Sequence, residues 1–404
     1  MKRSLFVMFG AMAVAVVLTT GCSKSMSAGG GGGMASPATS STQAASLRAA
    51  LNGLLAEHVS LAAAATGAAL DGRDGEFKAA AGALDANSVA ISQAIGSVYG
   101  KDAEAAFLPL WRKHIGMFVD YTVGVATKDS ARQQKAVNDL VGYTQDFGAF
   151  LASANPNLPK NVVADLVKHH VLTLKDVVDA QATKDHARAY AATRTASQHM
   201  AMIADPLAAA IVKQFPARFP GDPNGGAAAL RTALGTALRE HVYLAGAATG
   251  AALGGREAEF KAAANALDAN SVAISQAIGS VYGKDAEAAF LPLWRRHIGM
   301  VVDYTVGVAT SDKPKADKAL SDLIGYTQDF GAFLASANPN LPKAAVADLV
   351  KHHVVTLKDV IDAQAAKDPV RAYTAMRTAA GHMPMIGDPL AEAIVKQFPD
   401  RYKG

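Results

Sequence analysis

Apolar residues recur every three or four positions along most of the chain, and short polar turns separate the runs. This period is that of amphipathic helices, and no segment shows the two-residue alternation typical of a half-buried strand. Gly100 and the turn at 155–159 are clear helix ends. In the first half of the chain the pattern predicts helices over residues 47–69, 76–99, 102–127, 132–154, 160–182, 185–203 and 205–215.

From residue 47 the chain consists of two copies of one helical module, aligned without a gap. Residues 84–112 are identical to residues 267–295 even at positions expected to be exposed, which indicates a recent duplication. The turn-rich segment 219–226 separates the copies, which span residues 47–219 and 227–404. Short connections favour antiparallel neighbours. The sequence therefore predicts an all-α fold of two tandem, homologous, antiparallel helical bundles with about six helices each.

The chain begins with the layout of a secretory signal peptide over residues 1–21. Lys2 and Arg3 precede an apolar run and then small residues. Cys22 follows directly, and the junction resembles a bacterial lipobox, which implies a diacylated Cys22 as the mature N-terminus. An ordinary cleaved signal and an uncleaved anchor are the alternatives. Residues 22–46 are rich in glycine, serine, threonine and alanine, so we expect a lipidated, flexible linker.

These features predict a protein held on a lipid bilayer by N-terminal acyl chains and lying outside the cytoplasm. Ser23 stands where an aspartate resembles an inner-membrane retention signal, so the periplasmic face of an outer membrane is favoured if the cell has one. The net charge of +4 comes without basic clusters that alternate with aromatics, which argues against nucleic-acid binding. The single cysteine excludes a disulfide framework within the chain.

Histidines lie on the apolar stripes of four predicted helices in each module. Their positions are near mid-helix, and mid-helix positions meet in an antiparallel bundle, so each set could converge on one layer. Burying several neutral imidazoles is costly unless each finds a partner, and a metal ion is a common one. The predicted metal ligands are His58, His114, His170 and His199, with their equivalents His241, His297, His353 and His382.

Imidazole suits zinc, copper, iron and nickel, and no Glu-x-x-His pair indicates a carboxylate di-iron centre. Methionines near these histidines favour copper, especially Cu(I), because thioether and imidazole are both good ligands for it. The possible additional ligands are Met117, Met200, Met300 and Met383. Zinc, iron and non-covalent haem are the alternatives. Because ligating imidazoles must be deprotonated, we expect metal affinity to fall below about pH 6.

Metal buffering or delivery is therefore the first functional hypothesis. The second is an envelope structural or interaction protein whose buried histidines form a polar network, and a haem-binding electron-transfer protein is a further alternative. Enzymatic activity is less favoured, because no nucleophile–base pair, phosphate-binding glycine loop or paired carboxylates stand out. We predict no catalytic residue. His169 points off its apolar stripe and is interpreted as a surface residue.

One motif contains the only two tryptophans, Trp111 and Trp294. It reads FLPLWRKHIGMFVDY over 107–121 and FLPLWRRHIGMVVDY over 290–304, with AEHVSL upstream and LVKHHV downstream. It resembles a helical module of secreted and lipid-anchored bacterial proteins that is sometimes found with copper-amine-oxidase N-terminal-like domains. The resemblance covers both modules and implies an extracytoplasmic helical protein. It supplies no catalytic residue, and the amine-oxidase chemistry itself has no counterpart here.

Overall fold

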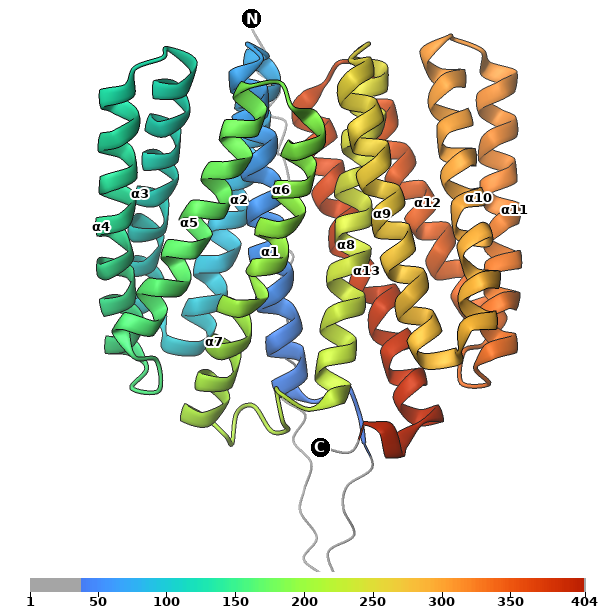
Figure 1. Cartoon of the computed structure of the whole chain (residues 1–404). Coiled ribbons are helices and arrows are strands. Elements are labelled where there is room, and N and C mark those ends of the chain that lie inside the picture. Colours follow the sequence, from blue (N-terminus) through green and yellow to red (C-terminus); the bar gives the residue numbers. More distant parts are fainter. Residues whose placement is uncertain (1–37, 403–404) are drawn as a thin grey trace, which may run out of the picture. The chain divides into compact units, whose positions relative to one another are not determined.

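Thirteen α-helices and one short 3-10 helix form the described part of the chain, residues 38–402, in this computed structural model (Figure 1). The first module contains α1 (Gln43–Leu70), α2 (Asp74–Tyr99), α3 (Lys101–Ala126), α4 (Ser130–Ala154), α5 (Lys160–Ala182), α6 (His186–His199) and α7 (Ala201–Gln214). The second contains α8 (Gly226–Leu253), α9 (Glu257–Tyr282), α10 (Lys284–Ala309), α11 (Lys313–Ala337), α12 (Lys343–Ala365), α13 (Pro369–Gln397) and η1 (Pro399–Arg401). The described residues contain no strand, so the prediction of tandem all-α bundles is confirmed.

Local sequence signals set several helix ends. The Asp129 side chain accepts a hydrogen bond from the Arg132 backbone N–H at 2.9 Å and so caps the start of α4. Gly100 has a φ of 95° and joins α2 to α3 without further linking residues. Residues with a side chain rarely adopt that φ, so glycine allows the chain to reverse there.

The folded part begins earlier than the sequence indicated. Helix α1 starts at Gln43, because Thr42 accepts a hydrogen bond from the Ala45 backbone N–H. Ser40 is fully buried, and its backbone N–H and hydroxyl both donate to a Glu392 carboxylate oxygen at 2.8 Å. The prediction of a flexible linker up to residue 46 is therefore wrong for its last residues. The signal segment 1–21, Cys22 and the linker up to residue 37 lie outside the described residues.

The boundary between the sixth and seventh helices also differs from the prediction. The sequence places a break at Asp205–Pro206, but α6 gives way to α7 at Met200 and Pro206 lies inside α7. In the second module the same region is one helix, α13, although Pro384 and Pro389 lie inside it. Both stretches pack along the first helix of their own module. This packing keeps the chain helical where a local proline signal alone predicts a break.

The first helix of each module is its packing centre. Helix α1 contacts α2, α5, α6 and α7, and α8 contacts α9, α12 and α13 in the same way. The modules meet through α1 and α8, which lie side by side (Figure 1), and through the reciprocal pairs α2–α13 and α6–α9. The same surface of each module thus packs on its counterpart, as in a two-fold dimer.

Helix α1 is the one described helix that is long and apolar enough to cross a membrane by length and composition. Its most apolar segment has a mean hydropathy of 1.3, and 67% of that segment is buried against the rest of the protein. These values are those expected for the central helix of a bundle.

Candidate metal centre

Three histidines from three helices meet in the core of each module. His58 from α1, His114 from α3 and His170 from α5 each place a ring nitrogen within 4.8 Å of the others. The Nε2 atoms of His58 and His114 are 3.4 Å apart. All three side chains are buried, with at most 3% exposed. We call this group the inner triad, and its equivalent in the second module is His241, His297 and His353.

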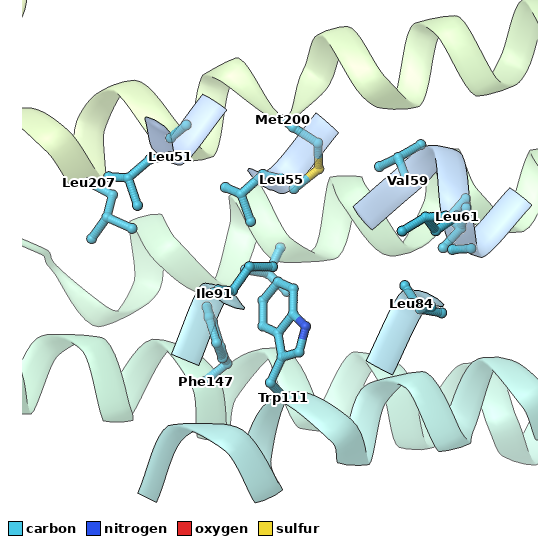
Figure 2. Close-up of a cluster of buried hydrophobic side chains, with 14 of the residues drawn as sticks. Leu51, Leu55, Val59, Leu61, Leu84, Ile91, Trp111, Phe147, Met200 and Leu207 are labelled. Atoms are coloured by element: carbon cyan, nitrogen blue, oxygen red, sulfur yellow. The ribbon is translucent and has the colours of Figure 1, made fainter. Parts of the chain in front are cut away.

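Aromatic side chains hold the rings in place. The ring centroid of Trp111 lies 4.6 Å from that of His114 and 5.0 Å from that of His58. Tyr143 from α4 packs on the other side of His114, with 5.3 Å between ring centroids. Figure 2 shows the Trp111 indole among the buried side chains around Leu55 and Phe147. The amphipathic pattern of α3 thus places His114 inside an apolar wall.

Several polar atoms of this layer have no hydrogen-bond partner of normal geometry within the described residues. They include Nδ1 of His58 and His114, both nitrogens of His170, Nε1 of Trp111 and the hydroxyl of Tyr143. The second module also has buried polar atoms without a partner, namely Nδ1 of all three triad rings, the Trp294 indole N–H and the Tyr326 hydroxyl. An unpaired buried polar atom is unfavourable, so a ligand that these nitrogens could bind would be stabilised in each triad.

The inner triad is electrically neutral over a wide pH range. Burial, reinforced by the neighbouring rings of His114 and His170, holds the pKa of His58 well below its ordinary value. Burial and His170 lower the pKa of His114 to about 3, although the Trp111 carbonyl opposes the shift. Burial and His199 lower the pKa of His170 to about 4. Near neutral pH the rings are therefore unprotonated, which is the form that binds metal ions.

A small cavity adjoins each inner triad. In the first module it measures about 40 Å³ and is lined by His114, His170 and Tyr143, among others. In the second module it measures about 50 Å³ and is lined by all three triad histidines. Such a space admits an ion or a few water molecules.

The four candidate methionines fall into two classes. Met200 and Met383 are 1% exposed and line these cavities. Met117 and Met300 are only partly buried, pack against the outer part of the core and are not among the cavity-lining residues. The structure therefore brings one thioether of each module to the walls of the cavity beside its triad.

The fourth predicted histidine of each module lies apart from the inner triad. The Nε2 atom of His199 is 3.2 Å from the Leu166 carbonyl oxygen, and its ring packs on His169 with 4.1 Å between centroids. His382 is placed likewise, 3.3 Å from the Leu349 carbonyl oxygen. The end of a helix does not explain this placement, because His199 is the last residue of α6 whereas His382 lies in the middle of α13. In both modules the ring faces a backbone carbonyl of the preceding helix instead of the triad. The sequence analysis missed the pairing with His169, although the His-His dipeptide occurs in both modules.

A larger cavity lies elsewhere, between the modules. It measures about 420 Å³ and is lined by parts of α1, α6, α8 and α13. Most of its charged side chains are paired with one another, such as Arg73 with Glu76 and Arg256 with Glu259. The buried, unpaired histidine nitrogens therefore lie at the inner triads, whereas the larger cavity is lined mainly by charged side chains that are already paired.

No protein-family model, curated protein or solved structure matches the chain. The functional conclusion therefore depends on the geometry of the site. Each module contains a buried triad of neutral histidines that could hold a metal ion.

Proposed function

We propose that the protein binds one metal ion in each inner triad, that copper is the preferred ion, and that the bound metal is stored or passed on. The observation that carries the proposal is the approach of three buried, neutral imidazoles to within 4.8 Å, in both modules. The 3.4 Å separation of the His58 and His114 Nε2 atoms supports it. Two nitrogens bound at about 2.0–2.1 Å to one tetrahedral ion lie about 3.3–3.5 Å apart.

A purely structural role for these histidines is the main alternative. Structural histidines in a core are normally satisfied by hydrogen bonds. His170 has both ring nitrogens buried without a partner. A core that needed only to be filled would be better packed with apolar residues than with three imidazoles that disfavour one another's charge. The unpaired nitrogens therefore favour a bound ion over a polar network.

The choice of copper depends on the donor set. Three imidazoles suit copper, zinc, iron and nickel, and no carboxylate belongs to either triad. The thioethers of Met200 and Met383 beside the cavities favour Cu(I). Haem is disfavoured, because pockets for ligands of its size measure about 300–1,000 Å³ and the triad cavities measure about 40 and 50 Å³.

We also propose where in the cell the protein binds metal. The signal-like segment 1–21 and Cys22 favour a lipid-anchored protein outside the cytoplasm, held on the bilayer by acyl chains. The resemblance of the Trp111 motif to modules of secreted and lipid-anchored proteins points the same way. A metal store or carrier in the bacterial cell envelope fits both features.

Metal analysis of the full-length protein tests the proposal. After incubation with Cu(I) and removal of weakly held metal by a chelator, we expect about two equivalents of copper per chain, and almost none when His114→Asn and His297→Asn are combined. A matched control, His186→Asn, changes a histidine outside the triads and should bind like the wild type. A folded wild-type protein that takes up neither copper nor zinc, iron or nickel would refute the proposal and leave the histidines as core architecture.

A further inference from the structure

A second group of side chains that can bind metal extends from the surface toward each inner triad. His169 is exposed and packs on His199, and Met202, one helical turn after His199, is 54% exposed. We call these three residues the outer site. The second module repeats it, with ring centroids 4.0 Å apart and a methionine that is 53% exposed. The equivalent residues are His352, His382 and Met385.

The outer site adjoins the inner triad through His170. His169 and His170 are consecutive residues of α5, and one is exposed while the other is buried. The Leu166 carbonyl, one turn before His170 on the same helix, contacts the His199 ring at 3.2 Å. The His199 ring thus contacts both the exposed His169 ring and the backbone of the helix that carries His170. Imidazoles therefore extend from the solvent to the buried site.

The exposed methionines have no packing role that accounts for them. Residues 196–207 and 379–390 differ at four positions, among them the exposed pair Gln198 and Gly381. The methionines at 202 and 385 are the same in both modules, although each has more than half of its surface in water. An exposed thioether gains little from burial but remains a good ligand for a soft metal ion.

We propose that the outer site captures Cu(I) from solution and passes it through His170 to the inner triad. This inference rests on metal binding by the triads. A triad that is at most 3% exposed needs a route by which an ion can reach it. The outer site supplies an exposed imidazole and an exposed thioether at the surface end of such a route, and the buried His199 imidazole behind them. An ion can therefore exchange ligands stepwise without being released into the apolar core.

The rate of copper loading tests this route. Full-length protein is mixed with Cu(I) held by a chromogenic Cu(I) chelator, and the transfer is followed by absorbance. We expect Met202→Leu combined with Met385→Leu, and separately His169→Asn combined with His352→Asn, to slow loading about tenfold or more. Both variants should still reach two ions per chain. Val119→Ala with Val302→Ala removes exposed apolar side chains elsewhere and should load at the wild-type rate.

A variant without triads separates this inference from the proposed function. With His114→Asn and His297→Asn, we expect weak Cu(I) binding that the chelator readily reverses and that Met202→Leu with Met385→Leu reduces further. If wild-type protein takes up no metal, the proposed function fails and this inference with it. If it takes up two ions and the outer-site variants load at the wild-type rate, the outer site is refuted while the triads stand. A final stoichiometry that falls with the outer-site variants would also overturn the handover, because the outer site would then be the store.

Discussion

The histidines of the inner triad are bases whose burial makes protonation unfavourable. A sequence-based estimate with the ordinary histidine pKa predicted that metal affinity falls below about pH 6. Burial lowers the pKa of His114 to about 3 and that of His170 to about 4. Proton competition for these nitrogens therefore begins near pH 4, and retention of metal at pH 5 is compatible with histidine ligation.

The lowered pKa values make the stability of the metal-free protein depend on pH. The unfolded chain binds protons at its histidines below about pH 6.5, whereas the folded triads stay neutral until about pH 3–4. The unfolded state therefore binds more protons in this window, and stability falls on acidification. Each buried histidine contributes up to about 1.4 kcal/mol per pH unit. Urea unfolding of metal-free protein at pH 7, 6 and 5 should show this loss.

Replacing one triad histidine in each module should reduce that dependence. His114→Asn with His297→Asn removes two buried groups that bind a proton more readily in the unfolded state than in the folded state. The stability of the double variant should therefore fall less steeply between pH 7 and 5. His186→Asn, which changes a histidine outside the triads, is the control. An equal slope in all three proteins would show that the triad histidines do not control the acid sensitivity.

The positions of the triad histidines could be predicted from sequence, and the outer site could not. His58, His114 and His170 lie on apolar stripes near the middle of long helices, so helical periodicity alone brings them together. The same periodicity also placed His199 and His382 in the layer, and it gives no signal that their rings face the Leu166 and Leu349 carbonyls instead. Its pairing with His169 depends on the angle between α5 and α6, which periodicity does not specify.

At the scale of elements, one close approach sets the packing of α4 against α5. A Cβ atom on Gly148 would lie 2.5 Å from the Lys160 carbonyl oxygen, which belongs to the backbone at the start of α5. Gly331 in the second module meets the Lys343 carbonyl oxygen in the same way, at 2.6 Å. Such a distance is shorter than any normal contact, so a side chain here would force the two helices apart.

Two glycine substitutions on the same helix should therefore have opposite effects. Gly148→Ala should destabilise the protein by about 1–3 kcal/mol, since overpacking outweighs the better helix propensity of alanine. Gly142→Ala, with nothing within 4 Å of the added atom, should stabilise it by about 0.5–1 kcal/mol. Chemical unfolding of both variants checks the prediction. Stabilisation by both substitutions would show that α4 and α5 do not approach as closely as described.

The whole described part behaves as a dimer within one chain, but its halves are no longer equivalent where they meet. The ion pair of Arg194 with Glu240 is matched by that of Arg377 with Glu57. Two other positions differ. Tyr243 stands where the first module has Ser60, and its hydroxyl donates to Glu57 at 2.8 Å. The duplication could be recognised from the sequence. The surface on which the two copies meet could not be predicted, because its residues come from helices that are far apart in the sequence.

Arg239 is the second such position, where the first module has Ala56. Its guanidinium packs where a Cβ atom on Gly53 would meet it at 3.0 Å. Burial lowers the pKa of Arg239, and the charge of Glu57 opposes that shift. Glu57 thus compensates two arginines and a tyrosine hydroxyl of the second module. Glu240 has no tyrosine partner, and its side chain is more exposed, at 18% against 7% for Glu57.

This asymmetry leads to a prediction about cooperativity. Glu57→Ala should destabilise the protein by about 3–5 kcal/mol, because it leaves the partly buried Arg239 and Tyr243 without their carboxylate. Glu240→Ala, the matched change in the other module, should cost about 1–2 kcal/mol. Urea unfolding followed by tryptophan fluorescence reports both modules, since each contains one tryptophan. In Glu57→Ala the single transition should broaden or split as the modules separate before they unfold, whereas equal costs for the two variants would mean that the interface is still symmetric in energy.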